Sequence, residues 1–246
     1  MAARLTRGRR AATVAALAAA AASAALWTAP RWLVPWLAAR APGCVFAVRT
    51  SERVVALTLD DGPDPAHTPA LLRVLRAHGA RATFFLISGN VPGREALVAA
   101  AVADGHELGN PLTRDEPSVR LAPAAFAAAL REAGAVLARF APVAWLRPGG
   151  GWYDATMLAT IERAGYRCAL GSVYPYDPHV PSVRFAAAYI LANARPGAVI
   201  VLHEGGARGA RAVETLRRVL PALRARGYRV VTLSELDRLR HAAPGT

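Results

Sequence analysis

Two carboxylates stand side by side at Asp60 and Asp61, and a further acidic side chain follows at Asp115. Neighbouring residues of an extended backbone point to opposite sides, so Asp60 and Asp61 can serve as a general base and a metal ligand. Closely packed carboxylates raise each other's pKa unless a cation intervenes, and either a metal or Arg147 could supply that charge. His203 could supply an acid near neutral pH. A base, an acid, a cation and a metal position describe metal-assisted hydrolysis of a carbonyl compound.

The loop that contains Asp115 carries an incomplete metal-binding pattern. A His followed four residues later by His or Asp would hold a divalent metal with both side chains. Asp115 fills the second position, but the first is Pro111, which has no donor atom. Proline also fixes φ and removes a backbone donor, so the loop can be aimed differently. The residues leave open whether this chain binds a metal here.

The elements that must position these side chains alternate between apolar, β-branched runs and amphipathic segments. Strands are expected at 54–60, 82–87, 106–110, 143–147, 166–173, 198–203 and 228–233, and helices from Thr68 to Gly79, at 94–104 and 122–139, from Asp154 to Ala164, and at 184–194 and 211–225. Thr68 and Asp154 are the expected caps of their helices. Strands that are apolar on both faces and alternate with helices predict a parallel sheet or barrel of about seven units.

Polar side chains gather directly after these strands. They are Asp60 and Asp61, residues 110–115, Arg147, Asp177, and His203 with Glu204. In a parallel barrel the carboxyl ends of all strands face one rim, and active sites are built there. The sequence therefore predicts one site made from five separate segments.

The motifs TLDDGPDPAHTP, ATFFLI, GHELGN followed by Asp115, RPGGGWY and IVLHEG resemble, in order and spacing, those of the polysaccharide deacetylase family. This is the NodB-homology domain of carbohydrate esterase family 4, and the resemblance runs from about Arg53 to about Leu236. It implies a distorted (β/α)7 barrel. It also implies removal of N-acetyl groups from GlcNAc-containing polymers such as chitin and peptidoglycan, or of acetyl esters from xylan.

The resemblance also implies roles for individual residues. The catalytic group would comprise Asp60 as base, Arg147 as its tether, His203 as acid and Asp177 as the residue that orients the acid. The metal, zinc or cobalt, would be held by Asp61 and Asp115. The substrate would meet Leu202 in the acetyl pocket, a backbone N–H near Gly150 or Gly151 at the oxyanion, and the rings of Trp152, Tyr153, Tyr174 and Tyr176.

The chain departs from the family pattern at Pro111, because the family has His there. Two oxygen ligands and no imidazole remain, so zinc or cobalt should bind more weakly. Three explanations stay open: a weaker or rearranged metal site, a pseudoenzyme that still binds glycan, or a recent single-base change from a His codon. His106 is expected to pack under the loop, and His67 and His179 are more readily assigned to surface or core than to the site.

The N-terminal segment, residues 1–30, is a signal peptide or a signal-anchor transmembrane helix. Arginines precede an apolar run from Ala11 to Ala29, which is long enough to favour an uncleaved anchor, although residues 22–24 form a possible cleavage site. Residues 31–52 are expected to be a linker, and residues 53–240 the catalytic domain. The domain would lie outside the cytoplasm, either anchored or secreted.

The chain has 30 basic residues, all arginine, against 17 acidic ones, and a net charge of +13. This excess favours anionic partners such as an acidic envelope polymer, in addition to the N-acetylated polysaccharide and the membrane. No nucleic-acid-binding motif is found, and no such partner is expected. Cys44 and Cys168 could form a disulfide in an exported protein, or Cys168 could be a buried free thiol.

Overall fold

The computed structural model describes residues 2–240, with only the backbone for residues 2–12. The strands are β1 (Cys44–Val45), β2 (Val54–Gly62), β3 (Thr83–Leu86), β4 (Glu107–Asn110), β5 (Trp145–Leu146), β6 (Arg167–Ala169), β7 (Val199–His203) and β8 (Arg229–Val231). The helices are α1 (Ala2–Arg40), α2 (Thr68–Ala77), α3 (Glu95–Ala103), α4 (Pro123–Leu137), α5 (Ala155–Arg163), α6 (Val183–Asn193), α7 (Ala207–Ala225) and α8 (Leu233–Arg238). The expected alternation of strands and helices is therefore confirmed between β2 and β8.

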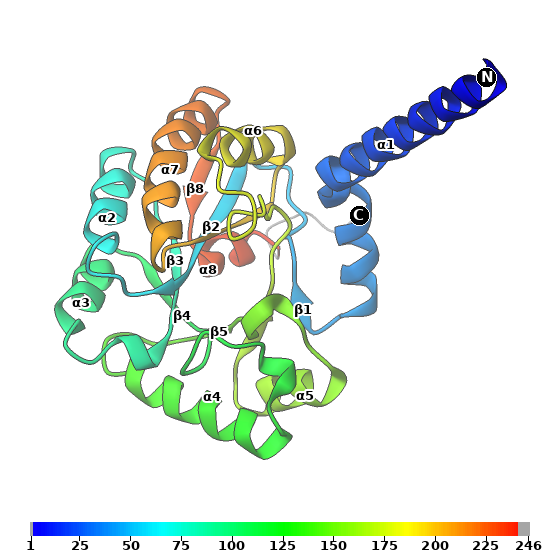
Figure 1. Ribbon diagram of the computed structural model, residues 1–246. Coiled ribbons are helices and arrows are strands. Elements are labelled where there is room, and N and C mark those ends of the chain that lie inside the picture. Colours follow the sequence, from blue (N-terminus) through cyan, green and yellow to red (C-terminus); the bar gives the residue numbers. More distant parts are fainter. Residues whose placement is uncertain (1, 241–246) are drawn as a thin grey trace.

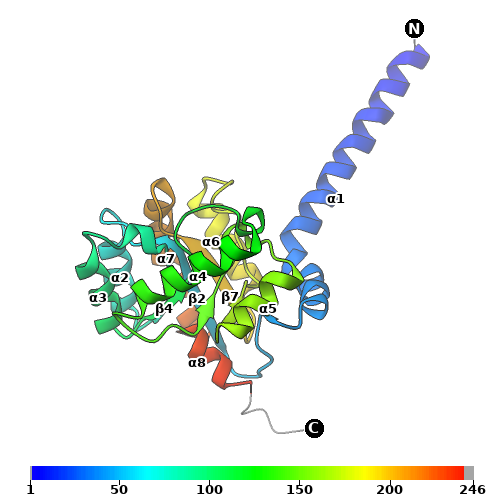
Figure 2. The same cartoon turned by 90° about the horizontal axis from the view of Figure 1, so that it is seen from below.

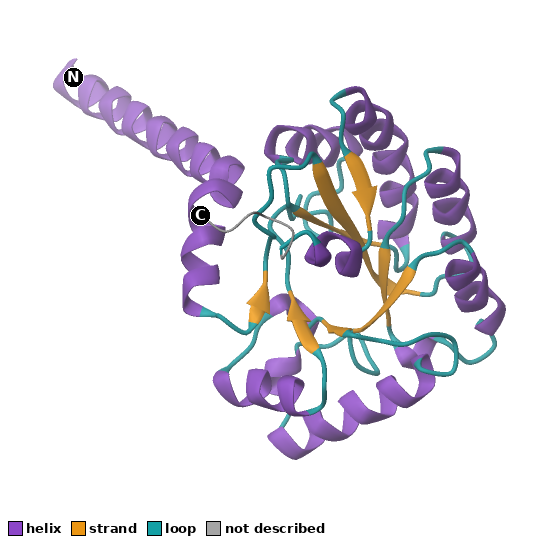
Figure 3. Cartoon of the chain, turned by 180° about the vertical axis from the view of Figure 1, so that it is seen from behind, coloured by secondary structure: helices purple, strands orange, loops and turns teal. Residues whose placement is uncertain are grey.

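The strands form one parallel sheet in the order β1-β6-β5-β4-β3-β2-β7, and β8 pairs with the first residues of β2. Two isolated bridges, Ala47 with Ala198 and Val173 with Ile200, join the segments after β1 and β6 to β7. The strands thus curve into a distorted barrel of eight strands (Figure 3). The predicted α/β class is correct. The additional strand, β1, has only two residues, too few for a periodic pattern in the sequence.

Helices α2 to α7 surround the outside of the barrel (Figure 1). Successive side chains of a strand point to opposite faces, so Leu57 and Leu59 of β2 face the helices while Asp60 faces inward. Leu57 and Leu59 belong to the same buried cluster as Leu71 of α2 and Leu216 of α7. This packing fixes the face of β2 that is presented to the interior.

Helix α8 covers the end of the barrel where the strands begin. Leu233 and Leu236 belong to the interior cluster that also contains Phe85 and Trp145. The indole Nε1 of Trp145, at the start of β5, donates a hydrogen bond of 2.9 Å to Ser234 Oγ. The amino-terminal end is therefore filled, and the carboxyl-terminal end is the one that can carry a site.

The first part of helix α1 projects from the domain as a rod, and its second part bends to lie beside the domain (Figures 1 and 2). Its segment Thr13–Arg40 has a mean hydropathy of 1.4 and is long and apolar enough to cross a membrane. Its second half packs on the domain: the Trp27 ring lies 5.5 Å from that of Phe185 and 5.4 Å from that of Tyr189, both in α6. Asn193 Nδ2 also donates to the Trp27 carbonyl at 3.1 Å.

Two local features of the structure differ from the sequence-based expectation. Residues 31–52, expected to be a linker, contain the end of α1 and strand β1. Thr68 is not the cap of α2 but its first residue, after His67, and its hydroxyl instead donates to Glu204 Oε2 at 3.3 Å. By contrast, Asp154 caps α5 as predicted, because its side chain accepts from the Met157 N–H at 2.8 Å.

Candidate active site

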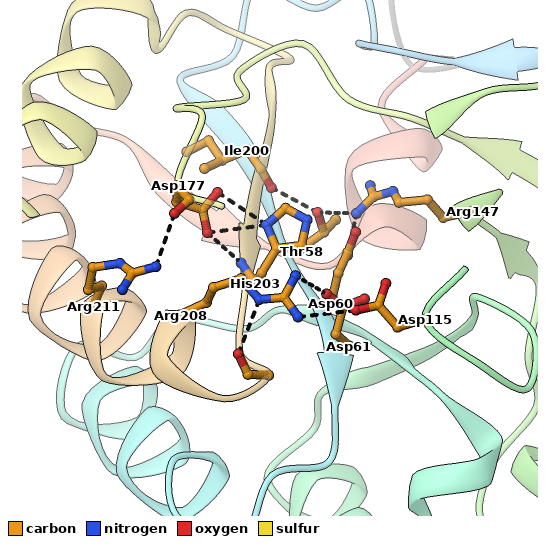
Figure 4. Close-up of polar contacts among 11 residues, drawn as sticks. Thr58, Asp60, Asp61, Asp115, Arg147, Asp177, Ile200, His203, Arg208 and Arg211 are labelled. Atoms are coloured by element: carbon orange, nitrogen blue, oxygen red, sulfur yellow. Dashed lines mark hydrogen bonds and ion pairs between the residues drawn. The ribbon is translucent and has the colours of Figure 1, made fainter. Parts of the chain in front are cut away.

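A pocket with a volume of about 910 Å³ opens at the carboxyl end of the barrel. Its walls include residues at or just after the ends of five different strands. Figure 4 shows the central side chains: Asp60 and Asp61 at the end of β2, Asp115 after β4, Arg147 after β5 and His203 at the end of β7, with Asp177, which follows β6, beside His203. Asp177 contacts His203 from behind and does not itself line the pocket. The structure therefore brings together, from separate segments, the residues that the sequence predicted to be catalytic.

Asp60 is held by a buried arginine. Arg147 Nη1 lies 2.6 Å from Asp60 Oδ1 and also donates to Thr58 Oγ1 at 2.7 Å. Its Nε donates to the Ala169 carbonyl at 3.0 Å, and its guanidinium lies 4.2 Å from the centre of the Phe85 ring. Because Arg147 and Asp60 are 5% and 7% exposed, this charge pair is shielded from water. Arg147 fixes the carboxylate of Asp60 in one orientation, with a positive charge beside it.

His203 forms a second pair with Asp177. His203 Nδ1 lies 3.1 Å from Asp177 Oδ1, and the His203 N–H donates to Oδ2 at 3.0 Å. Burial opposes the charged imidazole, but the hydrogen bond that Asp177 accepts from His203 and the charges of the nearby carboxylates outweigh it, so the pKa of His203 is raised. Since Asp177 takes Nδ1, the other ring nitrogen is the one available to a substrate.

Asp60 and His203 are direct neighbours in the sheet. They are register partners on the parallel strands β2 and β7. Both line the pocket, each backed by its own partner, Arg147 or Asp177. The arrangement places a fixed carboxylate and an imidazole with a raised pKa side by side in one cavity, and these are the groups that acid–base catalysis requires.

Asp61 follows Asp60 at an irregular point near the end of β2 and lines the same pocket. The register of β2 with β3 shifts between Asp60 and Gly62, and Asp61 has a φ of 74°. A left-handed backbone at a non-glycine residue is costly and is found mostly at functional sites. Burial, and after it the charge of Asp60, raises the pKa of Asp61 to about 6.

The cation nearest Asp61 is Arg208, on the first turn of α7. Its Nη1 lies 3.1 Å from Asp61 Oδ2, and its Nη2 lies 3.3 Å from Asp115 Oδ2. Its Nε donates to the Gly205 carbonyl at 3.1 Å. The guanidinium therefore bridges the two carboxylates that were predicted to bind a metal (Figure 4).

The donor set does not fit a zinc or cobalt ion. Among residues 2–240, no group of three or more His, Cys, Asp or Glu side chains could hold a metal ion. Zinc sites in proteins have at least three protein ligands, and here Asp61 and Asp115 are already paired with Arg208.

The loop at Pro111 is well ordered by its own hydrogen bonds. Pro111 is buried and lines the pocket at the place where a His ligand was expected. The next residue, Leu112, has a φ of 78°, and its N–H donates to Asn110 Oδ1 at 2.8 Å. The Leu112 carbonyl accepts from the Ser88 N–H at 3.2 Å. The proline ring presents an apolar surface to the pocket in place of an imidazole.

The predicted substrate-contacting residues lie at the pocket, with one exception. Gly150, Trp152, Tyr153 and Tyr174 line it. Trp152 is 70% exposed, so its face is accessible to a sugar ring. The exception is Leu202, which is fully buried in the core outside the barrel, and Val201 lines the pocket instead. Because side chains alternate along β7, only Val201 can share the inner face with His203.

Within the part of the chain that the structure describes, His67, His106 and His179 do not complete a group of three metal ligands. His106 packs against Phe84, with ring centres 5.2 Å apart, and its Nδ1 accepts from the Ala82 N–H at 3.2 Å. Burial lowers the pKa of His106 to about 4. His67 lies 3.3 Å from Asp64, and His179 lines the pocket.

Sequence reasoning missed Arg208 and the buried state of Glu204. Burial raises the pKa of Glu204 well above its usual value, which favours the neutral form of this side chain. The position of Arg208 in the sequence could have indicated its place in the site. It follows His203, the last residue of β7, by five positions, and a residue so soon after a barrel strand can reach the same rim. An arginine at the start of a helix gives no pattern of its own.

Two relatives share most of the chain. A peptidoglycan-N-acetylglucosamine deacetylase of Bacillus cereus is 34% identical over 199 residues, covering 80% of this chain and 93% of the relative. A chitooligosaccharide deacetylase of Bradyrhizobium sp. is 34% identical over 213 residues, covering 78% of this chain and 97% of the relative.

Two solved structures have the same fold. A peptidoglycan N-acetylglucosamine deacetylase matches with a TM-score of 0.75 and 28% identity, over 80% of this chain and 93% of that one. A family 4 acetyl xylan esterase from Clostridium thermocellum, in complex with a cobalt ion, matches with a TM-score of 0.70 and 28% identity, over 76% and 91%. The family model of the polysaccharide deacetylases matches residues 47–169, half of the chain. This match and the two relatives agree with the motifs on the rim, and the chain belongs to the polysaccharide deacetylase family.

Proposed function

We propose that this protein hydrolyses N-acetyl groups of a GlcNAc-containing polysaccharide, of the peptidoglycan or chitin type. The observation that carries the proposal is the pairing of Asp60 with His203 across β2 and β7, each held by its own buried side-chain partner, Arg147 or Asp177. The names of the relatives, which act on peptidoglycan and on chitooligosaccharide, support the substrate class.

In the proposed reaction a water molecule attacks the amide carbonyl carbon. Asp60 accepts the proton of that water, while Arg147 keeps the carboxylate oriented. The amide C–N bond then breaks as His203, held by Asp177, donates a proton to the nitrogen. Acetate and a free amino sugar are the products. A backbone N–H near Gly150 would stabilise the negative oxygen.

The pocket walls support the binding of a sugar chain. Trp152 and Tyr153 follow the turn at residues 149–151, and Tyr174 stands on the opposite side, with its ring centre 5.9 Å from that of His203. Aromatic faces suit the apolar faces of sugar rings. The net charge of +13 favours an anionic envelope polymer over a neutral one.

A second function, glycan binding with little or no turnover, is favoured by the incomplete donor set. Pro111 removes one expected ligand, and Arg208 occupies the two that remain. The described residues therefore contain no three-ligand site for the zinc or cobalt ion that the family is expected to use. A low rate, or none, follows if the reaction needs a metal to polarise the carbonyl.

We further propose that α1 anchors the domain to a membrane, with the pocket outside the cytoplasm. The apolar length of Thr13–Arg40 supports this location, as do the cell-wall substrates named for the relatives. Residues of its second half, Ala29, Leu33 and Leu37 among them, line the pocket. An anchored domain would thus hold its pocket close to the membrane surface.

The test is acetate release from GlcNAc oligomers and from purified peptidoglycan. The unchanged protein is expected to release acetate, and Asp60→Asn to reduce the rate by about 10²-fold or more. Asp104→Asn is the matched control, because Asp104 pairs with Arg76 on the surface. Release that survives Asp60→Asn would refute the assignment of the base. If the unchanged protein and Asp60→Asn both bind the glycan and neither releases acetate, the function is glycan binding and not hydrolysis.

A further inference from the structure

The guanidinium of Arg208 is fixed on three sides. Its two terminal nitrogens contact Asp61 at 3.1 Å and Asp115 at 3.3 Å, and its Nε contacts the Gly205 carbonyl at 3.1 Å. Arginine carries its donors in a planar fork, so these contacts orient the group as a unit. It does not behave as a charge on a freely moving surface chain.

The backbone before Arg208 is shaped to bring it there. Gly206 precedes α7 with a φ of 56°, which turns the chain sharply after β7. A Cβ on Gly205 would lie 3.2 Å from Arg208 Nη2 and 3.2 Å from Asp61 Cβ, closer than ordinary contact. The absence of a side chain at residue 205 therefore leaves room for the approach of Arg208 to Asp61.

Two arginines pair with the three carboxylates of the site. Asp60 is paired with Arg147 in the interior, which leaves the side chain of Asp61, 15% exposed, beside a second carboxylate. Asp61 needs a cation of its own, since burying an uncompensated charge is costly. Arg208 provides it, with a side chain that is 27% exposed and therefore reachable from solvent.

We propose that Arg208 is a built-in cation that takes the place of a divalent metal between Asp61 and Asp115. A metal ligated by these two carboxylates would stand at about 2.0–2.2 Å from their oxygens, where the guanidinium now donates. The metal and Arg208 therefore exclude one another. Pro111 removes a metal ligand and Arg208 pairs with the two carboxylates that are left, so the two residues form one arrangement. This inference concerns the cation of the pocket and stands whether or not the pocket hydrolyses N-acetyl groups.

The test is zinc affinity by isothermal titration calorimetry of the full chain in detergent. The set comprises the unchanged protein, Arg208→Gln, Pro111→His and the double variant, with Arg217→Gln combined with Pro111→His as control. Arg217 lies on the same helix and pairs only with exposed Glu214 among the contacts of the structure. Mutual exclusion predicts no saturable binding by the unchanged protein and the tightest binding by the double variant. Its affinity should exceed that of Pro111→His by about tenfold or more, while the control pair should match Pro111→His.

Two results would overturn the proposal. One is equal zinc affinity for Pro111→His with and without Arg208. The other is stoichiometric zinc binding by the unchanged protein. If circular dichroism shows that the double variant does not fold, the thermal unfolding midpoint of the unchanged protein tests the proposal instead. It should not move with added zinc, and a rise that grows with zinc concentration would contradict the proposal.

Discussion

Arg147 and Asp60, 87 positions apart in the sequence, form an ion pair of 2.6 Å between Nη1 and Oδ1, with side chains only 6% and 10% exposed. Replacing Arg147 by Met leaves the Asp60 charge buried without a partner. The free energy of unfolding is expected to fall by about 3–5 kcal/mol, measured by urea denaturation.

The control for that change is Arg76→Met, because Arg76 makes its ion pair with Asp104 at the surface. An exposed pair contributes about 0–1 kcal/mol. Equal losses for Arg147→Met and Arg76→Met would show that Arg147 is not the buried tether of Asp60.

Asp177→Asn should lower the pKa of His203. The pKa of this imidazole is raised because Asp177 and the other carboxylates outweigh its burial. Protonation of His203 therefore stabilises the folded protein. This contribution to the free energy of unfolding is fully present below the unfolded pKa of about 6.5 and is lost as the pH rises through the pKa of the folded state. In the variant this loss, and the alkaline limb of any acetate release, should move to lower pH. NMR titration of the His203 ring measures the shift, and an unchanged pKa would contradict the pairing.

His106 should make the fold sensitive to acid. Burial lowers its pKa to about 4, so between pH 6.5 and 4 the unfolded chain binds a proton that the folded chain refuses. Stability is lost as the pH falls through this window, by up to about 3 kcal/mol. His106→Asn keeps an acceptor for the Ala82 N–H and has no charge to gain. The difference in unfolding free energy between the two proteins should therefore change across this window, and a constant difference would show that His106 is not the source.

Cys44 and Cys168 should form a disulfide when the protein folds in an oxidising compartment. They are register partners on β1 and β6, and their free thiols lie in contact, with the two Sγ atoms 2.7 Å apart. The neighbouring thiol, with burial, raises the pKa of Cys168, so oxidation is expected during folding rather than afterwards. Intact mass without reductant should be lower by two hydrogens, and reduction should cost about 2–4 kcal/mol. A full-mass exported protein would refute this.

The barrel strands that the sequence predicted best were the long apolar ones. β2 and β7 are runs of buried residues with clear limits, whereas β1 and β5 have two residues each and depend on neighbours far away in the chain. Leu202 was assigned to the pocket by resemblance, but alternation along β7 gives that place to Val201.

The sequence predicted the site residues that belong to a local motif. It did not predict a residue whose place in the site depends on a contact with a distant part of the chain. Asp60, Asp61, Arg147 and His203 each stand in a recognisable motif at the end of a strand. The partnership of Arg208 with Asp115 joins positions 93 apart and leaves no mark in either local sequence. Only the folded chain shows that the charge opposite Asp61 belongs to an arginine.

The most direct measurement of the central claim, that Arg208 is the cation between Asp61 and Asp115, is a crystal structure grown with equimolar Zn²⁺ and anomalous data at the zinc edge. The expected map shows the guanidinium within hydrogen-bonding distance of both carboxylates and no anomalous peak between them. A zinc peak bound to Asp61 and Asp115, with Arg208 turned away, would contradict the claim.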